Sequence, residues 1–169
     1  MEQQKRKSIR LKNYDYSSSG AYFITICVKN KKNLLWNVGA ICGRPFTDNH
    51  YLSDYGLVVN NEICKINEIY KNSVILDKYV IMPNHMHMIL ILHNEVDGRI
   101  QVDGQPQVAP TISRIIQQFK GSVSKQIGFS MWQKLFHDHV IRNEQEYLKI
   151  WEYIDTNPLK WELDRYHAK

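Results

Sequence analysis

Two histidines separated by a single residue lie inside a long apolar stretch of the chain. The stretch covers residues 79–92 (YVIMPNHMHMILIL) and contains His85 and His87. Successive side chains of an extended strand point to opposite faces, so the two imidazoles would share one face, about 6.6–7 Å apart along the chain. Burying two imidazoles costs free energy unless their nitrogens have partners. Because neutral imidazole is a common metal ligand, the pair predicts a metal site; two core histidines bonded to backbone carbonyls or water are the alternative.

A tyrosine and an asparagine are spaced to stack on the last predicted helix. Tyr153 and Asn157 are four residues apart, the spacing that places side chains one above the other. On a helical wheel, Tyr153 lies about 110° from the centre of an apolar stripe that we expect to anchor the helix in the core. The stripe consists of Tyr147, Ile150, Trp151 and Ile154. Tyr153 can therefore reach into a cleft; the alternatives are a half-exposed tyrosine and, for Asn157 before Pro158, a helix C-terminus.

Hydrophobic periodicity predicts the elements that position these residues. The predicted strands cover residues 21–28, 74–82, 85–92 and 132–141. The predicted helices cover 52–70, a segment that begins after Thr111, and 143–157, with caps at Ser53 or Asp54, Thr111 and Asn143. The second helix would bury Ile112, Ile115, Ile116, Phe119 and Val123.

The order of these elements is β, α, β, β, α, β, α. It predicts an α+β fold with a ferredoxin-like (RRM-like) antiparallel sheet, helices on one face, and an extra C-terminal helix that carries the tyrosine. Residues 29–49 are expected to form a loop or short hairpin, and residues 93–110, rich in Gly, Gln, Pro and Asp, a flexible surface loop. Residues 1–13 form a basic arm, which is either a solvated terminus or a contact for phosphates.

Composition limits the class of protein. The 169 residues, 43% of them hydrophobic, fit one globular domain spanning 1–169 and exclude wholesale disorder. No apolar run approaches the ~18–20 residues of a membrane span, so we expect a soluble, cytoplasmic protein without a membrane partner. The three cysteines, Cys27, Cys42 and Cys64, are widely spaced, which suits a reducing compartment and argues against a zinc ribbon. The net charge of +5 is compatible with a polyanionic partner.

Taken together, these motifs resemble the single-tyrosine HUH transposases, and most closely the REP-associated tyrosine transposases of bacteria. The similar segments are residues 79–92 around the histidine pair, Trp132-Gln133 with Phe136, residues 139–143 (HVIRN), residues 153–160 (YIDTNPLK) and the opening residues 20–25 (GAYFIT). The resemblance covers about residues 6–161. Each motif is weak by itself, but their order and spacing are specific.

The resemblance implies a metal-dependent endonuclease and strand transferase that acts on single-stranded DNA with hairpins. His85 and His87 would hold Mg²⁺ or Mn²⁺, with Asn157 as the third ligand; relatives outside the REP-associated group have Gln there. Tyr153 would be the catalytic nucleophile, giving a 5′-phosphotyrosine and a free 3′-hydroxyl. A homodimer that exchanges its tyrosine helices, and a chain that acts alone, are both open.

Basic residues and a second His-x-His sequence, His137 and His139, complete the candidates. We interpret His139 as a neighbour of the site or a DNA contact, His137 as a surface residue, and Lys149 as the lysine nearest the scissile phosphate. The candidate DNA contacts are Lys5, Arg6, Lys7, Arg10, Lys12, Arg114, Lys120, His139, Arg142 and Lys149. Each of them could instead be a solvated surface residue.

Two other functions fit the same sequence. A ferredoxin-like sheet can bind RNA or single-stranded DNA through aromatic side chains without cutting it. A metal hydrolase that uses bound water would not need Tyr153. The complete set of two histidines, a tyrosine and an asparagine argues against a decayed relative that only binds.

Overall fold

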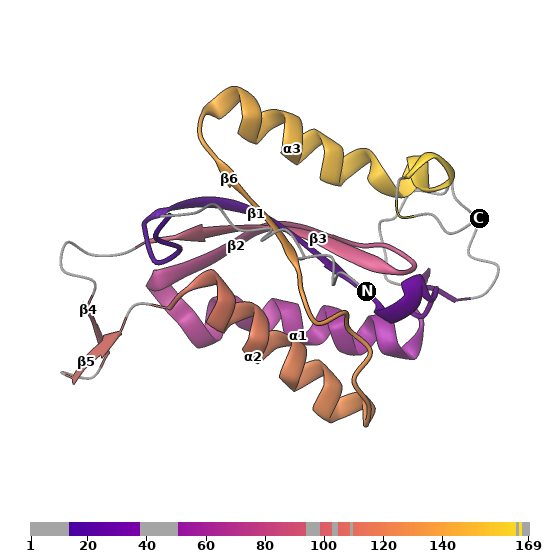
Figure 1. Cartoon of the computed structure of the whole chain (residues 1–169), viewed down its shortest axis with the longest axis horizontal. Coiled ribbons are helices and arrows are strands. Elements are labelled where there is room, and N and C mark those ends of the chain that lie inside the picture. The colour runs from indigo at the N-terminus through magenta and orange to yellow at the C-terminus, as the bar shows by residue number, and fades with distance from the viewer. Residues whose placement is uncertain are drawn as a thin grey trace, which may run out of the picture.

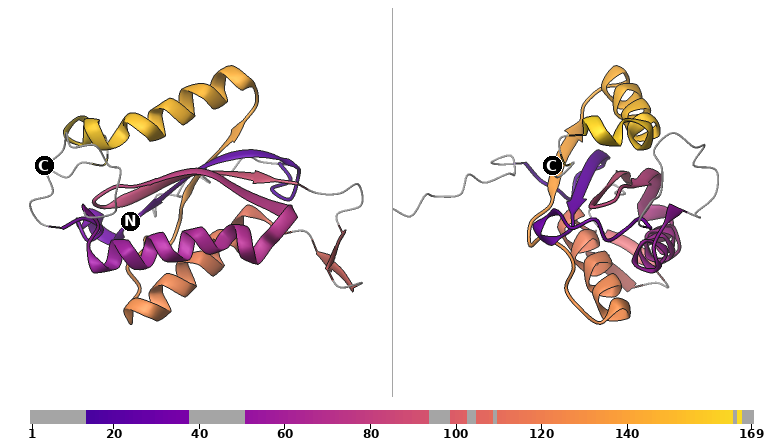
Figure 2. Two further views of the ribbon diagram at one scale, coloured as in Figure 1. Left: turned by 180° about the vertical axis from the view of Figure 1, so that it is seen from behind. Right: turned by 90° about the vertical axis from the view of Figure 1, so that its right-hand side faces the viewer.

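The protein has a four-stranded antiparallel sheet covered by helices on both faces (Figures 1 and 2). The computed structural model describes residues 14–37, 51–93, 99–102, 105–108, 110–164 and 166. The strands are β1 (Gly20–Cys27), β2 (Val74–Ile81), β3 (His85–Leu92) and β6 (His137–Ile141), in the order β2-β3-β1-β6. This is the strand order of the predicted ferredoxin-like sheet. The predicted basic arm, with Lys5, Arg6, Lys7, Arg10 and Lys12, lies outside the described residues.

The helices divide between the two faces of the sheet. Helices α1 (Asp54–Tyr70) and α2 (Ile112–Ile127) cover one face, and α3 (Glu144–Thr156) lies over the other (Figure 1). Short 3-10 segments are η1 (Lys29–Lys31), η3 (Lys71–Ser73) and η4 (Asn157–Leu163), the last continuing directly from α3. The additional C-terminal helix is therefore on the free face of the sheet, as predicted. Among the described residues, no helix is both long and apolar enough to cross a bilayer.

Each long helix begins at the side-chain cap that the sequence predicts. Ser53 accepts a hydrogen bond from the backbone N–H of Gly56, Thr111 from that of Arg114, and Asn143 from that of Glu146. These caps satisfy backbone donors that a helix leaves free at its first turn. All five residues of the predicted apolar stripe of α2 are buried against the sheet. The boundaries of the elements that frame the site are thus fixed locally.

Two segments and one side chain differ from the sequence-based prediction. The predicted strand 132–141 is interrupted: Trp132 forms an isolated bridge with Val28, and β6 begins only at His137. Between them, the carbonyls of Gln133 and Leu135 accept hydrogen bonds from the Lys120 ammonium. Trp151, predicted to be buried, is 40% exposed, and its ring lies 3.1 Å from the Lys78 ammonium. The predicted loop 93–110 contains a hairpin, β4 (Arg99–Val102) and β5 (Gln105–Val108).

Gly56 lies where the backbone at Leu35 passes close to helix α1. A Cβ added to Gly56, in the first turn of α1, would lie 2.2 Å from the carbonyl oxygen of Leu35. The same carbonyl accepts a hydrogen bond from the backbone N–H of Ser53, so it cannot move freely. We expect Gly56→Ala to lower the free energy of unfolding by about 3 kcal/mol.

The matched control for this prediction is Gly121→Ala. Gly121 is exposed on α2, and a Cβ there would meet no atom within 4 Å. Replacing a helical glycine by alanine at an open position should raise the free energy of unfolding by about 0.5–1 kcal/mol. Chemical denaturation of both variants measures the two effects; equal stability of Gly56→Ala and wild type would contradict the close packing.

Candidate metal and nucleophile site

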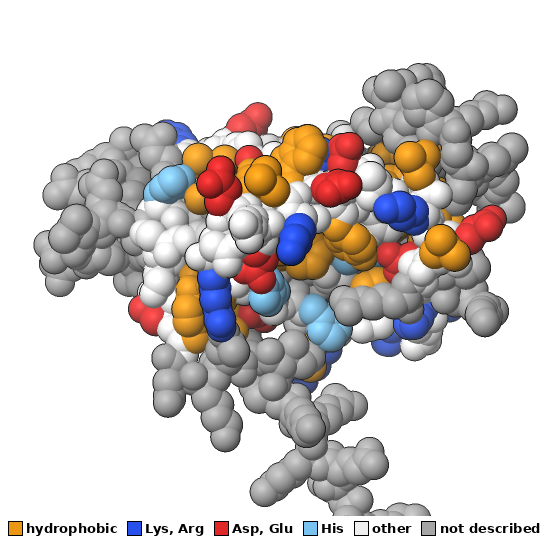
Figure 3. All heavy atoms as spheres, turned by 90° about the horizontal axis from the view of Figure 1, so that it is seen from above, with side chains coloured by type: hydrophobic (Ala, Val, Ile, Leu, Met, Phe, Trp, Pro, Cys, Tyr) orange, Lys and Arg blue, Asp and Glu red, His pale blue; other side chains and the backbone are white. Residues whose placement is uncertain are grey.

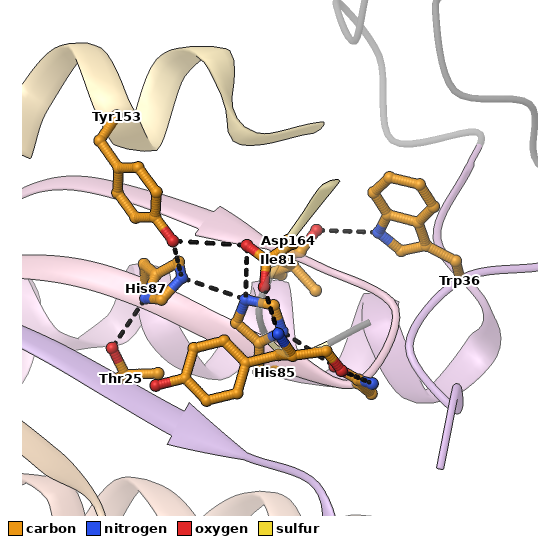
Figure 4. Close-up of polar contacts among 9 residues, drawn as sticks. Thr25, Trp36, Ile81, His85, His87, Tyr153 and Asp164 are labelled. Carbon is orange, nitrogen blue, oxygen red and sulfur yellow. Dashed lines mark hydrogen bonds and ion pairs between the residues drawn. The ribbon is translucent and has the colours of Figure 1, made fainter. Parts of the chain in front are cut away.

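The two histidines of β3 meet on the face of the sheet that α3 covers. Both side chains are fully buried, and their Nε2 atoms are 3.0 Å apart (Figure 4). Pro83 and Asn84 connect β2 to β3, and the N–H of Met82 bonds to the carbonyl of His85 across this tight turn. The alternation of the strand therefore places both imidazoles on one face, as the sequence predicts.

Each imidazole uses its other nitrogen to bond a neighbouring side chain. The Nδ1 atom of His87 lies 2.8 Å from the Thr25 hydroxyl, and the Nδ1 atom of His85 lies 2.9 Å from the Asn84 side-chain oxygen. Thr25 is on the central strand β1 and lies directly opposite His87 in the register. With both Nδ1 atoms engaged, only the two Nε2 atoms are directed at the space between the rings.

Tyr153 reaches this space from α3. Its hydroxyl oxygen lies 3.3 Å from Nε2 of His87, and its side chain is 38% exposed, at the border of the buried face (Figure 4). Phe23 of β1 stacks on the His87 ring at a centroid distance of 5.1 Å and contacts the Tyr153 ring edge-on at 6.1 Å. A half-exposed phenol held against a buried imidazole is accessible to a large substrate.

Asp164 is a member of the site that the sequence analysis missed. Its Oδ2 atom lies 4.0 Å from Nε2 of His85 and accepts a hydrogen bond of 3.4 Å from the Tyr153 hydroxyl. One nitrogen from each histidine and one Asp164 oxygen all lie within 4.8 Å of one another. The η4 segment returns the chain toward the sheet, so Asp164 belongs to no helical face or strand register from which its position could be predicted.

Asn157, the predicted third metal ligand, lies at the junction of α3 and η4. It is 2% exposed, and its amide nitrogen has no hydrogen-bond partner among the described residues. A pocket of about 240 Å³ is lined by Tyr153, Thr156, Asn157, Lys160, Leu163 and Asp164. The amide thus shares a pocket with the phenol and the carboxylate, while its role as a ligand remains a prediction.

The donor set suits a small divalent cation. Two imidazole nitrogens that face each other across 3.0 Å repel unless a proton or an ion lies between them. The nearby Asp164 carboxylate supplies an oxygen donor of the kind that Mg²⁺ and Mn²⁺ prefer. The residues therefore fit the predicted metal, and mixed nitrogen and oxygen ligation favours Mn²⁺ at least as much as Mg²⁺.

Comparison with known proteins agrees with this geometry. No family model matches the chain. It is 38% identical over 177 residues to an uncharacterized protein of Haemophilus influenzae, covering 96% of this chain and 93% of that protein. It is 23% identical over 154 residues to a REP-associated tyrosine transposase of the same organism, covering 89% of this chain and 77% of that protein.

The fold matches a solved member of the same group. The structure of a REP-associated tyrosine transposase bound to a REP hairpin aligns with a TM-score of 0.61 and 20% sequence identity, covering 92% of this chain and 76% of that one. The chain is thus similar to REP-associated tyrosine transposases in sequence and in fold. The resemblance read from the order of the motifs is therefore confirmed.

The candidate DNA contacts among the described residues are divided between the two faces of the sheet. Arg114 and Lys120 belong to α2, on the opposite face of the sheet from Tyr153 (Figure 2). Arg142, just before α3, and Lys149, on α3, are both exposed, but neither lines the pocket beside Tyr153. Lys160 does line this pocket. Seen from above, the face with α3 shows basic, acidic and hydrophobic side chains interspersed (Figure 3).

The second histidine pair does not form a comparable site among the described residues. His137 and His139 are both exposed on the edge strand β6, and Nε2 of His139 lies 2.7 Å from a Glu146 oxygen. The backbone N–H of Arg142 also bonds to Glu146, and both hydrogen bonds lower the pKa of that carboxyl. His139 thus helps to fix the start of α3, and its contact with DNA stays a prediction.

The partly buried ammonium of Lys120 has a structural role. Burial lowers the pKa of its ammonium from 10.5 to about 8. The unfolded chain therefore binds more protons than the folded one between pH 8 and 10.5, so Lys120 makes the folded state more stable as the pH rises through this window. We expect the difference in unfolding free energy between wild type and Lys120→Met to grow in favour of wild type from pH 7.5 to 9.5. Urea denaturation at both values measures it, and a constant difference would contradict the lowered pKa.

Proposed function

We propose that this protein is a metal-dependent single-stranded DNA endonuclease and strand transferase that acts on hairpin-bearing DNA through a 5′-phosphotyrosine. The observation that carries the proposal is the position of the Tyr153 phenol oxygen, 3.3 Å from Nε2 of His87, a member of the candidate metal pair. A tyrosine used only for packing would not need its hydroxyl at this point. The REP hairpin bound by the solved relative supports hairpin DNA as the substrate.

In the proposed reaction, the Tyr153 oxygen attacks a backbone phosphorus atom. A phosphorus–oxygen bond forms to tyrosine, the bond to the 3′-oxygen breaks, and the leaving oxygen takes a proton. The products are a 5′-phosphotyrosine and a free 3′-hydroxyl. Attack of a 3′-hydroxyl on the phosphotyrosine reverses the exchange and joins strands, so no nucleotide cofactor is required.

The residues around the phenol have separate tasks. A phenol with a pKa near 10 is a weak nucleophile at neutral pH and needs help from its surroundings. The Asp164 carboxylate accepts a hydrogen bond from the Tyr153 hydroxyl and is placed to orient its proton. Lys160 lines the same pocket and can pair with a phosphate. A divalent ion held by His85, His87 and oxygens of Asp164 and Asn157 would stabilise charge that develops on the phosphoryl group.

A direct test is incubation of the protein with Mn²⁺ and a single-stranded oligonucleotide that contains a hairpin. We expect a covalent adduct that survives denaturing electrophoresis, and mass spectrometry should place the nucleotide on Tyr153. Omission of metal, by addition of EDTA, is the control. Binding without an adduct would support a non-catalytic module instead, and cleavage without an adduct would support a hydrolase that uses water.

A further inference from the structure

The partners of the two histidines differ in kind, although all four side chains are buried. His85 bonds through Nδ1 to an amide oxygen, that of Asn84, whereas His87 bonds through Nδ1 to a hydroxyl, that of Thr25. An amide oxygen can only accept a hydrogen, while a hydroxyl can donate or accept. The two imidazoles are therefore not equivalent.

The orientation of the Asn84 amide follows from its other contacts. Its nitrogen lies 2.9 Å from the carbonyl oxygen of Tyr166 and 3.3 Å from that of Lys31. Carbonyl oxygens only accept, so the NH₂ group must be on this side and the amide oxygen must face His85. The hydrogen in the bond between Asn84 and His85 therefore belongs to Nδ1 of His85. A neutral His85 then has its lone pair on Nε2, which faces His87.

We propose that Asn84 is a positioning residue that holds His85 as the Nδ1–H tautomer and so keeps its Nε2 lone pair directed at the metal position. The inference deepens the proposed function and rests on it. A metal-ligating histidine gains orientation and basicity when its second nitrogen donates to an acceptor. Asn84 provides this acceptor from the turn that precedes β3, where its NH₂ group bonds to the carbonyls of Lys31 and Tyr166.

Thr25 allows either tautomer of His87, whereas Asn84 allows only one tautomer of His85. Without metal, His87 can carry its hydrogen on Nε2 and donate it to His85 across 3.0 Å, while the Thr25 hydroxyl donates to Nδ1. For both histidines to bind one ion, the hydrogen of His87 must be on Nδ1, and the Thr25 hydroxyl then accepts it. Asn84 fixes the tautomer of His85, whereas Thr25 accommodates both tautomers of His87. The two histidines therefore avoid repulsion between lone pairs when no metal is bound.

Asn84 also makes contacts that stabilise the fold. The test must therefore distinguish this stabilising role from the positioning of His85. Its backbone carbonyl accepts a hydrogen bond of 2.8 Å from the N–H of Val28, just after β1. Its amide nitrogen ties η1 and Tyr166 to the turn. Loss of the side chain could thus weaken the site by loosening the backbone alone.

The first measurement uses the wild-type protein without metal. Two-dimensional NMR of protein labelled with ¹⁵N in histidine distinguishes nitrogens that carry hydrogen from those that do not. We expect His85 to show a protonated Nδ1 and an unprotonated Nε2 at pH 7.5. An unprotonated Nδ1 on His85 would overturn the inference, whatever the variants do.

The second measurement is the affinity for Mn²⁺, determined by calorimetry on two variants. Asn84→Ala removes the acceptor and the amide donors, and should weaken binding about 10–100-fold. Asn84→Asp removes the NH₂ group but keeps an oxygen facing His85, so its affinity should stay closer to that of wild type than to that of Asn84→Ala. Equal weakening in both variants would assign Asn84 a merely structural role. Because neither readout requires DNA cleavage, failure of this inference can be distinguished from failure of the proposed function, which the adduct assay tests.

Discussion

Tyr153→Phe is expected to abolish the covalent adduct and strand cleavage, with a loss on the order of 10⁴-fold or more. The substitution removes the only atom of this side chain that can form a bond to phosphorus. The ring keeps its edge contact with Phe23, and the lost hydrogen bonds, of 3.3 and 3.4 Å to His87 and Asp164, are long. The free energy of unfolding should therefore change by no more than about 1 kcal/mol.

Tyr147→Phe is the matched control, because it removes a phenol from the same helix. The Tyr147 hydroxyl donates a hydrogen bond of 2.6 Å to Asp77, and this bond raises the pKa of Tyr147 to about 12. Tyr147 should be dispensable for adduct formation. Rates are compared by quenched time courses on denaturing gels. Cleavage that persists in Tyr153→Phe would exclude Tyr153 as the nucleophile.

The joint replacement of His85 and His87 by alanine should reduce the affinity for Mn²⁺ by more than about 100-fold. The change removes two proposed ligands, whereas loss of one supporting partner costs about 10–100-fold. The chain contains its own control in the second His-x-His sequence. His137→Ala with His139→Ala removes two exposed imidazoles with the same spacing, and metal affinity should barely change. Calorimetry measures both.

Two fully buried side chains leave a cavity when truncated, so the folding of the His85 and His87 variant must be checked by circular dichroism. A measurement on the wild type avoids this difficulty. Pulsed electron paramagnetic resonance of bound Mn²⁺ should detect imidazole nitrogen. If that signal disappears in the His137 and His139 variant instead, the metal site has been assigned to the wrong pair.

The parts of the fold that depend on local periodicity could be predicted from the sequence. The alternation of β3 placed His85 and His87 on one face because the period of a strand leaves no other arrangement. The helical wheel put Tyr153 at the border of α3, where the structure has it half-exposed. Ser53, Thr111 and Asn143 predicted the starts of helices because capping involves only residues within one turn.

What the sequence could not supply depends on contacts between distant segments. Asp164 reaches the histidines only because η4 folds back, and no periodic pattern signals this. Trp151 has the spacing of a core residue, yet Lys78 from β2 covers its ring. The hairpin of β4 and β5 had a local signal in Asp103-Gly104, a favoured two-residue turn sequence between short strands, but the polar composition of residues 93–110 obscured it.

The tyrosine helix closes over the histidines of its own chain, with the Tyr153 oxygen 3.3 Å from His87. In the proposed reaction, one polypeptide would therefore supply both the nucleophile and the metal ligands, without a contribution from a second copy. Mixed samples of a chain defective in Tyr153 and a chain defective in His85 and His87 should consequently fail to complement each other. Turnover per molecule should also be independent of dilution, which would let a lone copy nick DNA at concentrations where subunits never meet.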